Sequence, residues 1–184
     1  MRVLAISGSL RAASHNTALL RAAAEEAPHG VDVRRWDGLR EIPPYDADDD
    51  VVPGPPAVEE LRAAVRDADA VLIATPEYNS SVPGALKNAL DWASRPLATN
   101  AFRNKPVAVV GSSTGAFGAV WAQAELRKIL AAMGARVVDA ELAVGHVQEK
   151  LDADGTLLDD DVREQLGEVL QLLAAEAAPA LVAA

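Results

Sequence analysis

The sequence predicts an α/β fold, a three-layer sandwich in which a five-stranded parallel sheet lies between helices on both faces. Five short apolar runs rich in β-branched residues alternate with segments of helical period, the pattern of repeated strand–helix–strand units. Runs such as residues 71–74 and 107–110 are apolar at every position, as expected for strands covered on both faces. At 184 residues, half of them apolar, the chain can bury one core. We therefore expect residues 1–184 to form a single domain.

The elements follow one another in regular alternation. The first helix places Leu19, Leu20, Ala23 and Ala27 on one side, an apolar stripe of helical period. The predicted strands are residues 3–7, 31–36, 70–74, 107–111 and 136–144, and the predicted helices are residues 17–27, 56–67, 84–94, 119–133 and about 159–175. Five strands connected in this way favour the flavodoxin-like order 2-1-3-4-5. In such sheets the ligand crevice opens beyond the carboxyl ends of the strands. That rule selects the loops after the first, third and fourth strands.

Composition excludes several classes of function. The formal net charge is −10, which disfavours a nucleic-acid partner. Cysteine is absent, so disulfides, thiolate metal sites and thiol catalysis are excluded. We expect no metal site, because the aspartates at 46–50 and 152–161 are typical of solvated turns. No apolar stretch is long enough to span a bilayer, and the amino terminus reads as a strand rather than a signal peptide. We expect a cytoplasmic location and no membrane partner.

The first selected loop carries polar side chains around the amino end of a helix. Free N–H groups and the helix dipole favour an anion there, and the candidate contacts are Ser9, Arg11, Ser14, Asn16 and Thr17. Capping of the helix would explain one of these residues, but not all of them together with an arginine. The loop has neither G-x-x-x-x-G-K-[ST] nor G-x-G-x-x-G. We interpret it as a phosphate cradle.

The second selected loop, residues 75–84, is stiffened by prolines at both ends. Its polar side chains and Tyr78 suit a planar heterocycle with hydrogen-bonding edges. Alternatively, Tyr78 is an ordinary half-buried aromatic and Glu77 a surface charge. The loop alone leaves both interpretations open.

The third selected loop, residues 111–118, contains three glycines, which let backbone amides approach a flat ligand closely. It also fits G-x-S-x-G, with Ser113 as the possible nucleophile and Asp139 and His146 following in hydrolase order. These last two residues lie seven apart near one strand, where a triad is awkward to build. A hydrolase would also leave the first two loops unexplained, so it is the remote alternative.

Taken together, the three loops resemble the NADPH-dependent FMN reductase family, flavodoxin-like proteins that include quinone, chromate and azo-dye reductases. The matching segments are residues 8–11 with Ser14 and Asn16, and residues 76–92 with Pro-Glu-Tyr-Asn followed by Val-Pro-Gly-Ala-Leu-Lys-Asn-Ala-Leu-Asp-Trp. The resemblance implies phosphate contacts from the first loop and isoalloxazine contacts from the other two. The expected cofactor-binding residues are Ser9, Arg11, Ser14, Asn16, Thr17, Pro76, Glu77, Tyr78, Asn79, Ser80, Ser113 and Gly115. Many relatives have an aromatic residue where Ser80 stands.

The resemblance further implies an FMN-dependent enzyme that oxidises NADPH or NADH and reduces quinones, flavins or similar small acceptors in a ping-pong scheme. The flavin carries the chemistry, so we expect no catalytic side chain. A homodimer or homotetramer is implied by resemblance alone. The main alternative is a flavodoxin-like electron carrier that holds FMN without oxidising NAD(P)H. The sequence does not distinguish NADH from NADPH.

Overall fold

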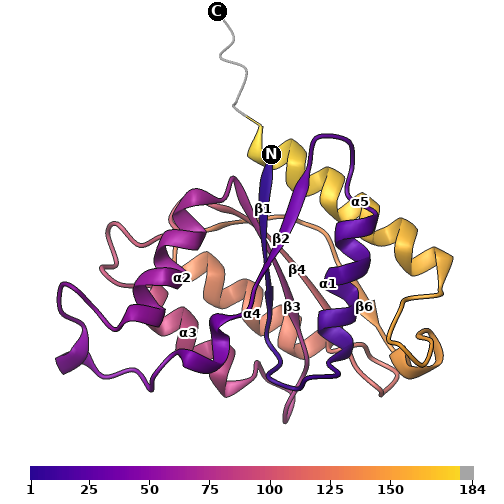
Figure 1. Cartoon of the computed structure of the whole chain (residues 1–184), viewed down its shortest axis with the longest axis horizontal. Helices are drawn as coiled ribbons and strands as arrows, with labels where there is room; N and C mark the ends of the chain where they lie inside the picture. The colour runs from indigo at the N-terminus through magenta and orange to yellow at the C-terminus, as the bar shows by residue number, and fades with distance from the viewer. Residues whose placement is uncertain (179–184) are drawn as a thin grey trace, which may run out of the picture.

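The computed structural model describes residues 1–178 and forms a parallel sheet between two layers of helices (Figure 1). The strands occur in the order β2-β1-β3-β4-β5, with β6 also paired to β4, and every pairing is parallel. Their bounds are β1 (Arg2–Ser7), β2 (Asp32–Trp36), β3 (Ala70–Thr75), β4 (Pro106–Ser112), β5 (Arg136–Val137) and β6 (Leu142–Val144). The predicted flavodoxin-like order is confirmed. Residues 179–184, which the predicted domain includes, lie outside the described residues.

The helices divide between the two faces of the sheet. On one face α1 (His15–Glu25) and α5 (Asp160–Ala177) pack together, and on the other lie α2 (Pro56–Asp67), α3 (Gly84–Ala93) and α4 (Val120–Ala132) (Figure 1). Strand β1 contributes side chains to both cores. Val3 and Ala5 pack in the core under α1 and α5, whereas Leu4 and Ile6 pack in the core under α2, α3 and α4. This alternation follows from the period of two along a strand. It explains why the central strands are apolar at every position.

The fifth strand differs from its prediction as one continuous run over residues 136–144. It is broken into β5 and β6, both paired with β4. The guanidinium of Arg127 on α4 donates to the carbonyls of Val109 (3.1 Å), Val138 (3.0 Å) and Ala140. The guanidinium of Arg127 therefore donates to backbone carbonyls at the break between β5 and β6, where a continuous strand would use sheet hydrogen bonds. The sequence pattern of the strand alone does not reveal this partner.

The segment between β2 and α2 contains two short 3₁₀ turns, η1 (Gly38–Glu41) and η2 (Ala47–Asp49). The Asp46 carboxylate accepts from the amide of Asp48, and Asp50 pairs with Arg62 at 3.0 Å. Arg62 has a side chain only 5% exposed and also donates to the carbonyl of Trp92 at 2.8 Å. The aspartates of this segment thus serve turn geometry and an internal ion pair. None of the helices within residues 1–178 has the length and apolarity needed to cross a bilayer.

Candidate functional site

The loop after β1 is held at both ends by backbone and hydroxyl contacts. The Gly8 amide donates to the carbonyl of Ala74 at the end of β3 (2.8 Å), and a Cβ on Gly8 would lie 2.9 Å from Leu86. At the other end Ser14 caps α1 by accepting from the amide of Thr17 (3.4 Å), so the capping interpretation holds for this residue. The Thr17 hydroxyl donates to Ser7 (3.0 Å). The loop is therefore a fixed frame around the amino end of α1.

Asn16 is a brace between this loop and β4. Its side chain, only 3% exposed, accepts from the Ser112 amide (3.0 Å) and donates to the Ser112 carbonyl (3.1 Å). These two bonds leave Asn16 one further side-chain N–H and its backbone N–H in the first turn of α1, and the residue lines the cavity described below. The contact with Ser112 joins the start of α1 to the end of β4, and the predicted contact of Asn16 with a phosphate stays a prediction.

The loop after β3 is a tight hairpin. The amide and carbonyl of Tyr78 pair with those of Ser81, both at 3.1 Å. Between them Asn79 (φ 53°) and Ser80 (φ 59°) are both left-handed, as a two-residue type I′ turn requires. Asn79 and Ser80 are exposed at the tip and are not among the residues that line the cavity described below.

Two glutamates bind this hairpin to α4, one from the hairpin and one from the helix. Glu77 accepts from the amides of Trp121 and Ala122, both at 3.0 Å, and so caps the amino end of α4. Glu125 on α4 accepts from the Ser81 hydroxyl (2.5 Å) and the Val82 amide (3.3 Å). These bonds hold the pKa of Glu125 below its usual value, with the Ser81 hydroxyl as the largest cause. The hairpin and the helix thus form one unit.

The loop after β4 is braced from behind by residues 144–147. Ser113 donates its amide to Val144 (3.1 Å) and accepts at its carbonyl from Val147 (3.2 Å), while the His146 amide donates to Gly115 (3.0 Å). A Cβ on Gly118 would lie 2.3 Å from the backbone of Ala143. The two segments pack backbone against backbone, a contact that only glycine permits at this position.

These three loops meet around one cavity of about 170 Å³ at the edge of the sheet where the strands end, the lower edge in Figure 1. The lining residues are Ser9, Arg11, Ser14, His15, Asn16, Pro76, Glu77, Tyr78, Ser112, Ser113 and Thr114. Of the predicted site residues, Thr17 lines a neighbouring cavity instead, and Asn79, Ser80 and Gly115 do not line this one. Sequence reasoning missed His15, Ser112 and Thr114. Their position directly beside predicted residues was the available signal.

The lining contains a buried hydroxyl without a hydrogen-bond partner and a histidine whose pKa is lowered. The Ser112 hydroxyl is buried and has no hydrogen-bond partner among the described residues, a rare condition that calls for an explanation. Burial lowers the pKa of His15 below its ordinary value, and the neighbouring charge of Arg11 lowers it further. Burial and the charge of Arg11 thus both favour the neutral form of the His15 imidazole.

Comparison with known proteins identifies the family. Residues 1–149 match the profile described as NADPH-dependent FMN reductase. The chain belongs to this family. An NAD(P)H-dependent FMN reductase of Pseudomonas aeruginosa is 44% identical over 174 residues, covering 94% of this chain and 93% of that protein. A quinone reductase of Escherichia coli K12 is 40% identical over 169 residues, covering 90% and 89%. The solved structure of FerB, a flavoenzyme NAD(P)H:acceptor oxidoreductase of Paracoccus denitrificans, superposes with a TM-score of 0.82 at 31% identity and covers 95% and 98%.

Membership of the FMN reductase family confirms the resemblance and the prediction that this chain is an NAD(P)H-dependent oxidoreductase. The geometry gives the hydrolase alternative no support. Ser113 donates its hydroxyl to the carbonyl of Gly115 (3.2 Å), and no hydrogen bond links Ser113, His146 and Asp139 among residues 1–178. The G-x-S-x-G spacing instead belongs to a loop that packs closely on residues 144–147.

Proposed function

We propose that this FMN reductase family member binds FMN in the cavity between the three strand-end loops, oxidises NAD(P)H there and reduces quinones or similar small acceptors. The observation that carries the proposal is that one cavity is lined both by the guanidinium-bearing Arg11 and by the exposed aromatic residue Tyr78. The similarity to a quinone reductase supports the choice of acceptor class.

The part of the cavity near α1 fits a phosphate. The amino-terminal amides of α1 have no intrahelical acceptors, the helix dipole favours a negative charge, and Arg11 adds a full positive charge to the same lining. Ser9 supplies a hydroxyl beside it. The phosphate of FMN is a dianion that these groups can hold with charge-assisted hydrogen bonds.

The part of the cavity near β3 and β4 fits a heterocycle with polar edges. Ser112, Ser113 and Thr114 line it, and the buried Ser112 hydroxyl has no hydrogen-bond partner among the described residues. The isoalloxazine ring presents carbonyl and nitrogen acceptors that would satisfy such donors. Tyr78, 54% exposed, also lines the cavity, and its ring would offer an apolar face to a flat ligand.

Bound FMN would supply the hydride chemistry, and the chain's own residues would hold and orient the reactants. The hairpin at residues 77–82 is fixed to α4 through Glu77 and Glu125, and the loop after β4 is fixed through residues 144–147. Rigid walls around a cavity open to solvent favour stacking of one flat reactant at a time. NAD(P)H and the acceptor would therefore use the same place in turn, which is a ping-pong scheme.

The test is reconstitution of the purified chain with FMN, followed by rapid anaerobic mixing with NADPH and with NADH, and then addition of a quinone. We expect tight FMN binding, bleaching of the flavin by at least one nucleotide, and return of its colour with the quinone. A protein that binds FMN but stays oxidised with both nucleotides is an electron carrier. A protein that does not bind FMN contradicts the proposal.

Other expectations remain predictions. A homodimer or homotetramer is supported by exposed aromatic side chains beside the cavity: Tyr78, Phe117 (64% exposed) and Trp121 (49% exposed), since apolar patches of this kind mark interaction sites. The single domain over residues 1–184 and the cytoplasmic location stay as the sequence predicts them. Light scattering of the FMN-loaded protein measures the assembly.

A further inference from the structure

Helix α4 begins without a cap of its own. Ala119 occupies the cap position with a left-handed φ of 64° and offers no side-chain acceptor, so the amides of the first turn need acceptors from elsewhere. Glu77, from the hairpin after β3, supplies one: a single carboxylate oxygen accepts from the amides of Trp121 and Ala122, both at 3.0 Å. A negative charge at this end also suits the helix dipole. The start of α4 therefore depends on a residue 44 positions before Trp121 in the chain.

The same stretch of α4 also holds the loop after β4. Gln123, only 4% exposed, donates to the carbonyl of Gly118 at the end of that loop (3.1 Å). Its side chain lies against Gly111, where an added Cβ would be 2.9 Å from Nε2 of Gln123. Glu125, in the next turn of the helix, accepts two bonds from the hairpin. Residues 121–125 are thus a common support for the two loops beside the ring part of the proposed FMN site.

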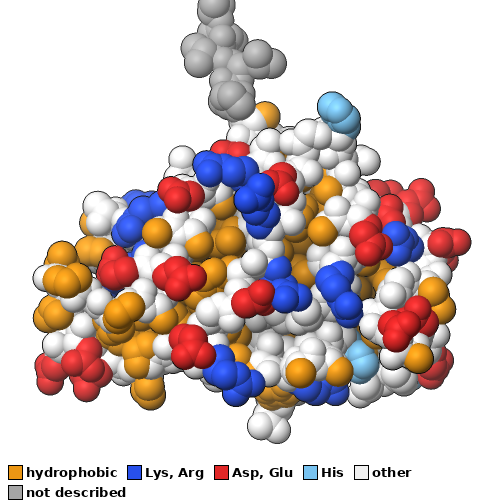
Figure 2. Space-filling model, in the orientation of Figure 1, with side chains coloured by type: hydrophobic (Ala, Val, Ile, Leu, Met, Phe, Trp, Pro, Cys, Tyr) orange, Lys and Arg blue, Asp and Glu red, His pale blue; other side chains and the backbone are white. Residues whose placement is uncertain are grey.

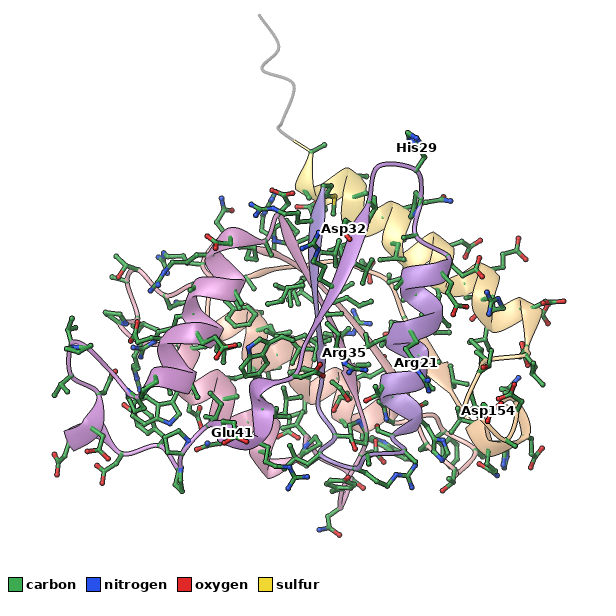
Figure 3. The ribbon with its side chains drawn as sticks, in the orientation of Figure 1. Arg21, His29, Asp32, Arg35, Glu41 and Asp154 are labelled. Atoms are coloured by element: carbon green, nitrogen blue, oxygen red, sulfur yellow. The ribbon has the colours of Figure 1, made fainter. Side chains whose placement is uncertain are left out.

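The hairpin in turn depends on α4 for its position. Within residues 1–178, all four hydrogen bonds that join residues 77–82 to another element go to α4, two through Glu77 and two through Glu125. None of the ion pairs of the described residues involves this hairpin. Figure 2 shows its tip as an uncharged projection at the lower edge of the molecule, and the labelled side chains of Arg21 and Asp154 in Figure 3 lie on other elements. The two glutamates are therefore the polar attachment of the hairpin.

We propose that Glu77 is a positioning residue for the reductase reaction: by joining the hairpin to α4 it fixes Tyr78, and with it the width of the space in which flat reactants stack. The inference rests on the proposed FMN site, which Glu77 and Tyr78 both line. Glu77 acts through α4 rather than on the reactants, because the carboxylate oxygen that bears both bonds is already engaged. Misplacement of a reactant by about 1 Å can lower a rate by roughly 100-fold. An anchor of the cavity wall therefore affects the hydride transfer without contacting it.

The kinetic test compares Glu77→Gln, Glu77→Asp and Glu77→Ala at saturating FMN. Since one oxygen accepts both bonds, Glu77→Gln keeps the acceptor at the same reach, whereas Glu77→Asp keeps the charge on a side chain one methylene shorter. In rapid anaerobic mixing with the nucleotide that reduces the wild type faster, Glu77→Gln should stay within about threefold of the wild-type rate, and Glu77→Asp and Glu77→Ala should be about tenfold slower or more. Glu77→Gln as slow as Glu77→Ala would assign the effect to charge and overturn the inference, as would a wild-type rate in Glu77→Asp.

Asp159→Ala is the matched control for the loss of a helix cap. The Asp159 carboxylate accepts from the amide of Val162 at the start of α5 (3.0 Å) and lies outside the cavity. We expect Asp159→Ala to lower the Tm, as the loss of a cap does, and to leave the rate of flavin reduction unchanged. A fall in this rate equal to that of Glu77→Ala would mean that any lost cap slows the enzyme, and would overturn the inference.

Amide hydrogen exchange on the FMN-free protein tests the anchor without the reaction. Glu77→Ala should speed exchange at the amides of Trp121 and Ala122 and also at that of Tyr78, which pairs with Ser81, whereas Glu77→Gln should keep their protection. Faster exchange confined to α4 would make Glu77 a helix cap only and overturn the inference. A wild-type protein that binds FMN but is not reduced contradicts the proposed function instead, and the exchange at Tyr78 then still decides whether Glu77 fixes the hairpin.

Discussion

Ser112 combines a firmly held backbone with a buried hydroxyl that has no partner among the described residues. Its backbone is held by Asn16, while its buried hydroxyl lacks a partner. An unsatisfied buried hydroxyl costs about 1–3 kcal/mol. The backbone bonds survive a change to alanine, so the hydroxyl can be tested by itself.

We expect Ser112→Ala to raise the stability of the FMN-free protein by about 1 kcal/mol and to lower its affinity for FMN. Urea unfolding and flavin-fluorescence titration measure the two effects. Ser94→Ala is the control, because the Ser94 hydroxyl already donates to Asp91 (2.7 Å) and should only lose stability. A destabilised Ser112→Ala protein with unchanged FMN affinity would refute this account.

Arg11 offers the corresponding test of the phosphate site. Removal of its charged donor in Arg11→Ala should weaken FMN binding by about 1.5–3 kcal/mol, roughly 10- to 100-fold. Riboflavin, which has no phosphate, should bind the variant and the wild type equally. Arg66→Ala, a change on α2 outside the cavity between the three loops, should leave both affinities unchanged.

At the scale of elements, the hairpin after β3 carries strain at its tip. Ser80 adopts φ 59°, a left-handed conformation that costs a non-glycine residue about 1–2 kcal/mol. Ser80→Gly creates the Asn-Gly pair preferred in such turns. Glycine also gives the unfolded chain more conformational freedom, which offsets part of this gain. We therefore expect a net rise of about 0.5–1 kcal/mol in the free energy of unfolding. Thermal unfolding measures it, with Ser94→Gly at φ −76° as a contrasting change that should destabilise.

The attachment of the hairpin to α4 should depend on pH. The pKa of Glu125 is lowered from 4.5 in the folded protein, so its contribution to stability is complete above that value and is lost as the pH falls through the folded pKa. Glu125→Gln should therefore lose less stability than the wild type between about pH 5 and pH 3. Glu168→Gln, at an exposed position of α5, should follow the wild type. Parallel curves for wild type and Glu125→Gln would exclude this linkage.

The elements also show where sequence reasoning reaches its limit. Strands β1, β3 and β4 are evident because their runs are apolar on both faces, and the strand ends alone select the three loops. The roles of Asn16 and Glu77 are not evident, because their partners lie 96 and 44 residues away in the chain. An amide or carboxylate in a loop has the same local appearance whether it binds a ligand or another loop. The packed structure shows the bonds of Asn16 to Ser112 and of Glu77 to α4, and it places both residues in the lining of the cavity.

At the scale of the whole molecule, Arg127 holds the last third of the sheet to β4. Its replacement by methionine removes the guanidinium donor from the carbonyls of Val109, Val138 and Ala140, of which that of Val138 keeps the amide of Ala140. We expect Arg127→Met to cost about 3 kcal/mol, or a fall in Tm of roughly 6–12 °C. The control Arg136→Met breaks an exposed pair with Glu176 (2.9 Å) and should cost less than about 1 kcal/mol. Equal losses would mean that the break in the strand needs no donor.

The same break has a consequence for encounters between molecules. An exposed edge strand presents unpaired amides and carbonyls, and a strand of another molecule can pair with them and start aggregation. Here the margin beyond β4 consists of runs of only two and three residues, β5 and β6. The opposite margin, β2, has the charged residues Asp32, Arg34 and Arg35. Short or charged borders resist such growth, so copies of this protein that associate must do so through helices and loops rather than by extending the sheet.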